Sequence, residues 1–508
     1  MPPRGLPGNA NLEQLRNGAK SFQRAVRSGD TGAAEVVREF HPRLPDAQPG
    51  SPELDAFTRA DAQLVVARSF NFPSWPRLKA YLETVSRYAR APHQQPVGRV
   101  GGDGVTEREL IDEFLRLACL NYGNDDPARR TRAAELLESH PVLSSASIYT
   151  AAAAGDVEAT RAFLDDDPAC VGREGGPFEW VPLLYVAYSR VGDRPLGRSS
   201  VDVARLLLDA GADPNAGYLW EGLSPPFTAL TGALGSGDSD PGPQEYGLAL
   251  ARLLLERGAD PNDSQALYNE NPDSYDDWIE LLLEFGLGTG DGGPWHRLLE
   301  PAHESPRDML EDALKAAAGN GFAHRVRILL DHGADPNGYG TRHPIYHGRS
   351  PLEEAAMHGY PDVVEILEQA GARNDLDATE LFLCAATAGN RTRVEGMLGA
   401  DPSLRELAIA RRPEQIVNAA AGDRPGAVAL LIDLGFDVNA VNRTTPLHVT
   451  ALHEAAMRGN MEIIRLLVEH GADVNIRDSG YDATPAGWAE HFGKADARKY
   501  LSEREAAP

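Results

Sequence analysis

The stretch TALHEAAMRGNMEIIRLLVEHGADVN, from Thr450 to Asn475, contains the pattern that decides the fold. Its closing phrase recurs along the chain as GADPN or a near copy. A phrase that returns every few dozen residues predicts stacked repeat units, each of which buries its apolar face against its neighbours. The closing phrases begin at Gly211, Gly258, Gly333, Gly435 and Gly471, and a weaker copy, GARND, begins at Gly371.

Each closing phrase follows a leucine-rich segment whose apolar residues recur at positions i, i+3 and i+4. That spacing predicts an amphipathic helix, and the next glycine predicts a left-handed residue that ends it. Earlier in the same stretch, Thr450 can cap a first helix, and Gly459 with Asn460 can form a tight turn. The predicted unit is therefore a helix, a turn, a second helix and a long loop. We count about ten such units from Thr106 onward, with a final cap near residues 484–501.

The phrase T-P-L-H that opens a unit and the phrase GADxN that closes it resemble the ankyrin repeat. The last stretch matches best, and a near-duplicate opening at residues 445–448 precedes it. Weaker openings are RSPLEEAAMHGY from Arg349 and FTALTGALGSGD from Phe227, and units before residue 200 match only in outline. The resemblance implies an all-α solenoid that acts as an interaction scaffold, in which catalysis by the repeats is unusual. We expect His453 to bond loop backbone in the next repeat.

The predicted order along the chain is a helical N-terminal module at residues 1–90, a flexible linker at 91–105 and the solenoid at 106–508. The linker, APHQQPVGRVGGDGV, is rich in proline and glycine. Residues 216–348 are irregular repeats, in which insertions break the pattern. Helices of the module are expected at residues 12–28, 33–40, 60–70 and 75–86, the last of them capped by Ser74.

Charge is distributed unevenly along the chain, whose formal net charge is −26. Residues 1–100 contain 14 Lys and Arg against 9 Asp and Glu, so the excess of acidic groups lies in the remaining 408 residues. Such an acidic body repels nucleic acid and anionic membranes at long range. It favours a protein partner with a basic surface, although solubility explains the charge comparably well.

The cysteine content and the hydropathy of the chain indicate the cellular compartment in which it is expected. The three cysteines, Cys119, Cys170 and Cys384, are far apart and odd in number, so they do not form a disulfide framework. The N-terminus has no apolar signal region, and no stretch approaches the length of a membrane span. We therefore expect a cytoplasmic protein with no cofactor. The preference for arginine over lysine is typical of a bacterial genome with high GC content.

The candidate binding residues lie where the repeat pattern breaks. Loops of successive repeats project along one side of a solenoid, and aromatic, arginine and histidine side chains in loops are frequent interface anchors. The aromatic ones, Trp220, Tyr268, Trp295 and Tyr346, are predicted to line one groove for a protein partner, and packing of irregular repeats is the alternative explanation for them. The candidates are Trp220, Glu221, Tyr268, Asn269, Trp295, His296, Arg342, His343, Tyr346, His347 and Arg349.

These loops allow two other interpretations, a zinc site and an enzyme or small-molecule site. His343 and His347 lie four residues apart, a spacing that suits zinc on a helix. Pro344 and Gly348 follow them directly, so an exposed binding loop is the better interpretation. The second interpretation is an enzyme or small-molecule binder, whose acid–base residues would be Glu221, Tyr268, His296, His343 and His347.

The N-terminal helices suggest a third function. Two helices joined by a short turn, with Arg68, Arg77, Lys79 and Arg87, resemble a helix-turn-helix in outline. The tight glycine turn and a dense basic recognition face are missing, so DNA binding is the weaker hypothesis. A module that docks on the solenoid or caps its open end is favoured, because an exposed terminal repeat needs a covering neighbour.

Overall fold

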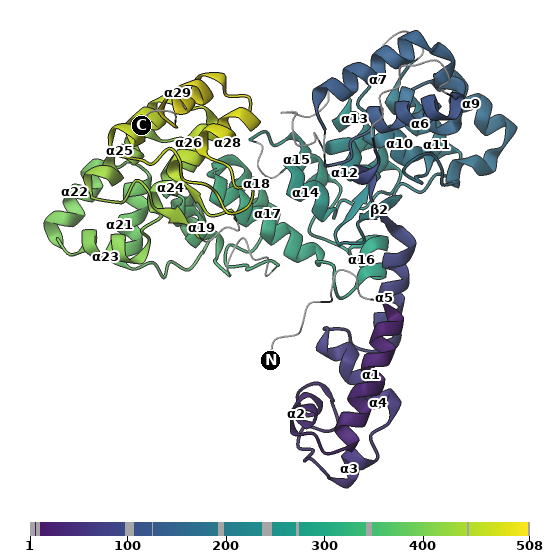
Figure 1. Ribbon diagram of the computed structural model, residues 1–508, viewed down its shortest axis with the longest axis horizontal. Helices are drawn as coiled ribbons and strands as arrows, with labels where there is room; N and C mark the ends of the chain where they lie inside the picture. Colours follow the sequence, from purple (N-terminus) through teal and green to yellow (C-terminus); the bar gives the residue numbers. More distant parts are fainter. Residues whose placement is uncertain are drawn as a thin grey trace. The chain divides into compact units, whose positions relative to one another are not determined.

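The computed structural model describes residues 6, 11–96, 106–123, 125–191, 198–235, 246–270, 274–341, 348–443 and 447–505. The chain is mostly helical, with 62% of its residues in helices and few strands, which confirms the predicted all-α solenoid. It divides into two compact units, Met1–Pro306 and Arg307–Pro508 (Figure 1). In the described part of the chain, no helix is both long and apolar enough to cross a membrane.

Four of the five N-terminal helices form where the sequence predicts them, the exception being the short helix at Pro52–Asp55, and α1 packs against α4 and α2. The first four helices share a hydrophobic core around Leu54, Phe57 and Val65, and α5 contributes Leu78 to a second cluster. Ser74 caps α5 by accepting a hydrogen bond from the Arg77 amide at 3.4 Å. The helices are α1 (Leu12–Arg27), α2 (Thr31–Phe40), α3 (Pro52–Asp55), α4 (Arg59–Ser69) and α5 (Trp75–Tyr88).

Helix pairs fill the rest of the first unit, and the first helix of each pair packs against the first helix of the next (Figure 1). A short helix, α16 (Gly293–Leu299), follows the last pair. The pairs are α6 (Glu107–Ala118) with α7 (Pro127–Ser139), α8 (Ile148–Ala154) with α9 (Val157–Asp166), α10 (Pro182–Tyr188) with α11 (Ser200–Asp209), α12 (Ala229–Leu234) with α13 (Gly247–Glu256) and α14 (Ser264–Glu270) with α15 (Asp277–Glu284).

The second unit continues the same pattern, and its last pair covers the segment for which we predict a cap. A helix absent from the pattern, α23 (Leu404–Arg411), lies between two pairs. The pairs are α17 (Pro306–Asn320) with α18 (Ala323–Asp331), α19 (Pro351–Met357) with α20 (Pro361–Gln369), α21 (Ala378–Thr387) with α22 (Arg391–Ala400), α24 (Gln415–Ala421) with α25 (Pro425–Asp433), α26 (Ala451–Arg458) with α27 (Met461–Glu469) and α28 (Pro485–His491) with α29 (Ala495–Glu505).

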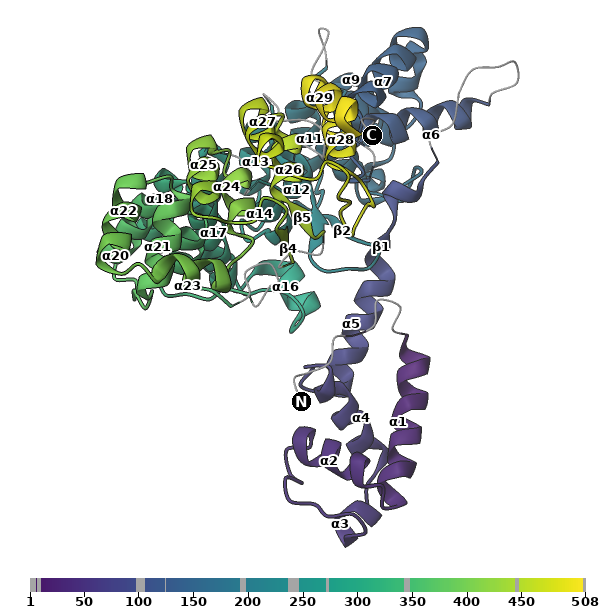
Figure 2. The same ribbon diagram turned by 60° about the vertical axis from the view of Figure 1, so that its left-hand side comes forward.

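Short strands form in the segments that connect repeats and at the end of the N-terminal module. β2 (Gly217–Trp220) and β3 (Pro226–Thr228) are antiparallel, with Tyr218 opposite Phe227. β1 (Ala89–Arg90) joins β2 in parallel (Figure 2). The strands of the second unit, β4 (Val441–Asn442) and β5 (Val449–Thr450), are antiparallel. Turns of 3-10 helix are η1 (Pro92–Gln94), η2 (Pro141–Ser145) and η3 (Pro168–Gly172).

The closing glycines end their helices in the left-handed conformation, as predicted. Gly211 has a φ of 97°, and Gly471 has a φ of 89°. Only glycine adopts this conformation without steric cost, which explains why the residue recurs at this position. The aspartate two residues after this glycine bonds within its own phrase. In the last phrase, Asp473 accepts a hydrogen bond from the Asn475 amide at 2.9 Å.

The last asparagine of the phrase has a role that the sequence did not predict. Asn215 Nδ2 donates to the carbonyl of Gly258 in the next repeat at 3.0 Å, and its Oδ1 accepts from the Asp260 amide at 2.9 Å. The same pair of bonds joins Asn439 to Gly471 and Asp473, at 3.1 and 2.7 Å. The asparagine therefore joins one repeat to the next, and we call this series of bonds the asparagine ladder.

Some second helices end differently. α7, α9 and α22 stop before a proline, at His140, Asp167 and Asp401, which have extended or bridging conformations. The residue before proline is sterically biased away from the helical conformation, so these helices need no glycine. The phrase GADPS at residues 399–403 therefore differs from GADPN in structure, because its glycine lies inside α22.

The opening phrase of the best repeat forms the predicted contacts. His453 is fully buried, and its Nδ1 accepts a hydrogen bond from the Thr450 amide at 3.2 Å. Its Nε2 donates to the carbonyl of Ala483 in the next connecting segment, at 3.2 Å. Asn460 caps the second helix by accepting from the Ile463 amide at 3.0 Å. These residues therefore have structural roles.

Candidate partner-binding surface

Exposed apolar side chains of the described residues concentrate on one kind of segment. The connections from the second helix of one repeat to the first helix of the next contain most of the large ones. Tyr268, which is 62% exposed, lies on a first helix, α14. Connections of this kind follow the same edge of a helical-repeat stack within each unit. The connecting-segment residues are Val142, Leu223, Leu298, Tyr339, Leu407 and Tyr481.

The predicted candidates Trp220 and Glu221 lie at the end of β2, where they meet the N-terminal module. The Trp220 ring stacks on His93 with 4.3 Å between ring centroids. Glu221 Oε1 accepts a hydrogen bond from Gln94 Nε2 at 2.5 Å and lies 3.2 Å from His93 Nε2. The chain itself therefore half-buries Trp220, whereas Glu221 is bonded to η1 but stays 38% exposed.

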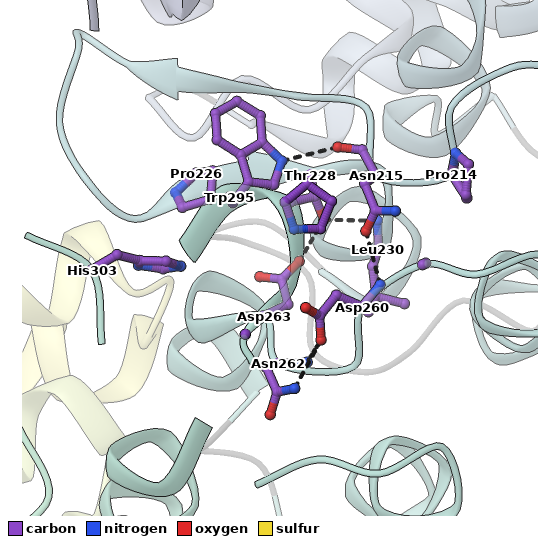
Figure 3. A pocket seen from close by; sticks show the side chains of 13 residues that line it. Pro214, Asn215, Pro226, Thr228, Leu230, Asp260, Asn262, Asp263, Trp295 and His303 are labelled. Carbon is purple, nitrogen blue, oxygen red and sulfur yellow. Dashed lines mark hydrogen bonds between the residues drawn. The ribbon is translucent and has the colours of Figure 1, made fainter. Parts of the chain in front are cut away.

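Trp295, on α16, is 7% exposed and also faces the N-terminal module. Its Nε1 donates to the Asn215 carbonyl at 2.9 Å (Figure 3). Its ring meets Tyr88 of α5 edge to face, with 4.9 Å between centroids. Leu219 and Leu299, both fully buried, complete the cluster. Trp295 is thus an interface residue within the first unit.

A cavity lies beside Trp295 and is lined by Asp260, Asn262, Asp263 and His303 among others (Figure 3). Its volume of about 20 Å³ accommodates one water molecule. Asp263 accepts hydrogen bonds from the Thr231 hydroxyl at 2.9 Å and the Ala266 amide at 2.9 Å, and burial raises the pKa of its carboxyl. The cavity is too small for an organic substrate.

Asn269 and His296 have their polar atoms engaged within the first unit. Asn269 Nδ2 donates to the Tyr122 hydroxyl at 3.2 Å, and its Oδ1 accepts from Gln265 Nε2 at 2.8 Å. His296 Nε2 lies 3.1 Å from Glu300 Oε1, and its Nδ1 lies 3.0 Å from the Glu304 carbonyl. Asn269 is therefore held in place beside the exposed Tyr268.

The predicted loop tip in the second unit is only partly described. Arg342, His343, Tyr346 and His347 lie outside the described residues. Arg349 Nε donates to Glu354 Oε1 at 2.6 Å, and Glu354 is buried. Of the candidates, the structure therefore brings Trp220 and Trp295 to the N-terminal module, leaves Tyr268 exposed and pairs Arg349 inside its repeat.

The acid–base candidates do not converge in the described residues. Glu221 is bonded to η1, whereas His296 is bonded near the end of α16. Tyr268 lies on α14 and is exposed. Within the described residues, no cluster of three or more His, Cys, Asp and Glu side chains could hold a metal ion. The three cysteines are buried and free.

The basic residues behind the DNA hypothesis mostly pair with carboxylates of the same chain. Arg77 lies 3.1 Å from Glu300, and Arg87 lies 2.9 Å from Glu174. Lys79 lies 3.2 Å from Glu83. The second helix of the predicted pair, α5, thus directs its arginines toward acidic residues of the repeats.

Two sets of surface residues were not found from the sequence. Leu223, Leu298 and Leu407 are exposed apolar residues in connecting segments; Leu223 lies between two strands, whereas Leu298 and Leu407 lie on the short helices α16 and α23. Tyr81 and Tyr88 of α5, which contact the Trp295 cluster, were the second set. Their spacing along a helix predicts a common face but not the surface that the face meets.

The structure thus defines a helical-repeat scaffold whose exposed apolar side chains lie on its connecting segments. A family model of ankyrin repeats, three copies long, matches residues 294–378, 381–478 and 416–508. The chain is therefore an ankyrin-repeat protein, with the matched repeats at residues 294–508. Ankyrin repeats are generally protein–protein interaction modules.

Curated relatives share parts of the chain. The ankyrin repeat and KH domain-containing protein mask-1 of Caenorhabditis elegans is 30% identical over 171 residues, which are 34% of this chain and 6% of the relative. The human ankyrin repeat and SOCS box protein 6 is 30% identical over 182 residues, 35% of each chain. A probable E3 ubiquitin-protein ligase of rice, XBOS31, is 35% identical over 125 residues, 24% of this chain and 27% of the relative. The chain thus covers about a third or less of these relatives.

Proposed function

We propose that this chain is a non-catalytic binding scaffold that holds a protein partner through the connecting segments and the concave face of its repeats. The observation that supports this proposal is the placement of exposed apolar side chains on those segments. A few large aromatic and aliphatic side chains supply most of the free energy of a typical protein interface. Tyr268 and Leu223, which are 62% and 48% exposed, are such side chains within the irregular repeats.

The charge of the chain supports a partner with a basic surface. The chain has a formal net charge of −26, and the acidic excess lies in the repeats and not in the N-terminal module. Complementary charge accelerates association and suppresses partners of the wrong sign. The cytoplasmic location remains a proposal, which is compatible with three free cysteines.

The proposal is tested by affinity capture with the full chain and matched variants. We expect Leu223→Ala with Tyr268→Ala to reduce retention of the captured partner by about tenfold or more, because each anchor contributes on the order of 1 kcal/mol or more. Phe492→Ala is the control, because Phe492 is 44% exposed but lies in the turn between the cap helices.

Circular dichroism and the denaturant midpoint check that both variants fold. Equal retention by the wild-type chain, the double variant and the control would contradict the proposed surface.

A further inference from the structure

We propose that the surface formed by β2 and α16 is a docking site for a basic amphipathic helix of a partner protein. In the free chain, α5 and η1 occupy this site as an internal competitor. We call it the β2–α16 surface; its centre is Leu219, Trp295 and Leu299. This inference rests on the proposed scaffold function and adds the chemistry of the partner.

The centre of the surface is apolar and receives one face of α5, which packs beside α16 (Figure 1). Tyr81, Val85 and Tyr88 stand at positions i, i+4 and i+7 of that helix, so their side chains share a face. All three pack against the Leu219, Trp295 and Leu299 cluster. An amphipathic helix laid on an apolar surface with anchors at this spacing is a recurring mode of protein recognition.

The rim of the surface is acidic and receives the arginines of the same segment. Arg77 donates to Glu300 Oε2 at 3.1 Å and to the Arg297 carbonyl at 2.7 Å. At the other end of α5, Arg87 and Arg90 lie 2.9 and 3.2 Å from carboxylate oxygens of Glu174. The rim therefore selects for a helix with an arginine near each end.

An extended stretch follows the helix and pairs with the backbone of β2. Arg90 is opposite Trp220 in the parallel register, and the Glu221 amide donates to the Arg90 carbonyl at 2.8 Å. His93 then stacks on Trp220. Main-chain hydrogen bonds of this kind are available to any extended segment, so a partner segment would pair with β2 in place of β1.

The features that make the internal cover releasable are its separate core and its polar contacts. The N-terminal module has apolar clusters of its own, one around Leu54, Phe57 and Val65 and one around Leu78 of α5, besides the contacts that α5 makes with the Trp295 cluster. The ion pairs at the rim are partly exposed, at 32% and 51% for Arg77 and Glu300. Exposed ion pairs contribute little and are screened by salt, so the cover is held mainly by its apolar contacts and by the pairing of β1 with β2.

A partner segment that fits the β2–α16 surface must therefore carry the features with which α5 contacts it. It is a helix with aromatic or aliphatic residues at i, i+4 and i+7, an arginine near each end and an extended segment after it. A partner segment with these features would displace α5 and η1 and bind the same surface. A basic segment is also the natural complement of this acidic chain.

The test uses a fluorescent peptide of residues 75–95 as the probe and an opened full-length chain as the receptor. Arg77→Ala with Tyr88→Ala weakens the internal contact but leaves β2 and α16 unchanged, and alanine preserves the α5 helix. We expect the opened chain to bind the peptide at least about tenfold more tightly than the wild-type chain, because the competitor is weakened. Lys79→Ala is the matched control, since Lys79 pairs with Glu83 of the same helix, and it should leave peptide affinity at the wild-type level.

A variant of the surface completes the experiment. In the opened chain, Glu300→Lys should weaken peptide binding by about tenfold, because the carboxylate that accepts from Arg77 becomes a cation. The inference is overturned if the opened chain binds the peptide no better than the wild-type chain, or if Glu300→Lys has no effect.

The two proposals can fail separately. If peptide binding fails while capture of a partner still depends on Leu223 and Tyr268, only the β2–α16 surface is refuted. If peptide binding behaves as expected while Leu223→Ala with Tyr268→Ala retains all captured protein, the connecting-segment surface is refuted and the β2–α16 surface stands.

Discussion

The closing asparagine shows how one side chain links neighbouring repeats. Asn439 bonds to the Gly471 carbonyl and the Asp473 amide, whereas the Asn475 side chain, in the last phrase, reaches no other repeat within the described residues and lies 3.4 Å from Asp473 Oδ1. We expect Asn439→Ala to lower the free energy of unfolding by about 1–2 kcal/mol, because two hydrogen bonds are lost. Denaturant unfolding measures the change, and hydrogen exchange should show that the Asp473 amide loses protection. Asn475→Ala is the control, with a change below about 0.5 kcal/mol; equal effects of both variants would contradict the ladder.

His358 predicts how the stability of the folded chain depends on pH. Burial and the nearby guanidinium groups of Arg349 and Arg424 lower the pKa of His358 to about 4. In the unfolded chain its pKa is about 6.5, so between these values the unfolded state binds more protons and stability falls as pH falls.

Since 31% of the His358 side chain is exposed, water screens part of this effect, and we expect it to cost on the order of 1 kcal/mol. His358→Gln should flatten the fall in the denaturant midpoint between about pH 6.5 and pH 4 relative to the wild-type chain. Parallel pH profiles for the two proteins would contradict the assignment.

At the scale of elements, the connecting segment before the cap depends on a single carboxylate. Asp478 accepts hydrogen bonds from the Gly480 and Tyr481 amides through Oδ1, at 2.8 and 2.6 Å. Its Oδ2 accepts from the Ala483 amide at 3.0 Å and from Trp488 Nε1 at 2.9 Å. The carboxylate thereby ties the connection to the first cap helix, α28.

We expect Asp478→Asn to destabilise the cap by about 2–4 kcal/mol, because the new amide hydrogens must face existing donors. Hydrogen exchange should rise in α28 and α29 more than in α19 and α20. Asp482→Asn is the matched control in the same loop, since the Asp482 side chain is 85% exposed and asparagine tolerates its positive φ. A cap that keeps its protection in Asp478→Asn would show that the carboxylate is dispensable.

At the scale of the whole chain, the asparagine ladder stops inside the first unit. Asn262 reaches the Gly288 amide and the Thr289 carbonyl in the next phrase, GLGTG, at 2.8 and 3.0 Å. That phrase has Gly290 where the others have asparagine. The ladder has a second series, from Asn337 to Gly371, in the other compact unit.

Repeat stacks propagate stability through nearest neighbours, so the loss of one ladder bond is expected to act first on the adjacent repeats of the same unit. We expect Asn215→Ala to reduce hydrogen-exchange protection in α11 to α14 while α24 to α29 keep theirs. Asn439→Ala is the reciprocal variant and should affect only the second unit. Loss of protection in both units from either substitution would contradict independent units.

The repeat fold could be predicted because its signals are local. The left-handed Gly471, the capping Thr450 and the buried His453 each act within one repeat or on the next connecting segment. The spacing of apolar residues was sufficient to predict which helices pair. The irregular region at residues 216–348 stays a prediction from the sequence, made where the closing phrase and the opening phrase fail to recur.

The sequence by itself determined the all-α repeat stack, its approximate units and the segments where it departs from regularity, since these depend on short-range patterns. Only the tertiary structure decided what the departures contact. Trp220 and Trp295 looked like exposed anchors, yet His93 and Tyr88 cover them from far along the chain. The physical reason is that a solvent-facing anchor and a docked one have the same residue type, and the difference lies in a partner surface that no local pattern encodes.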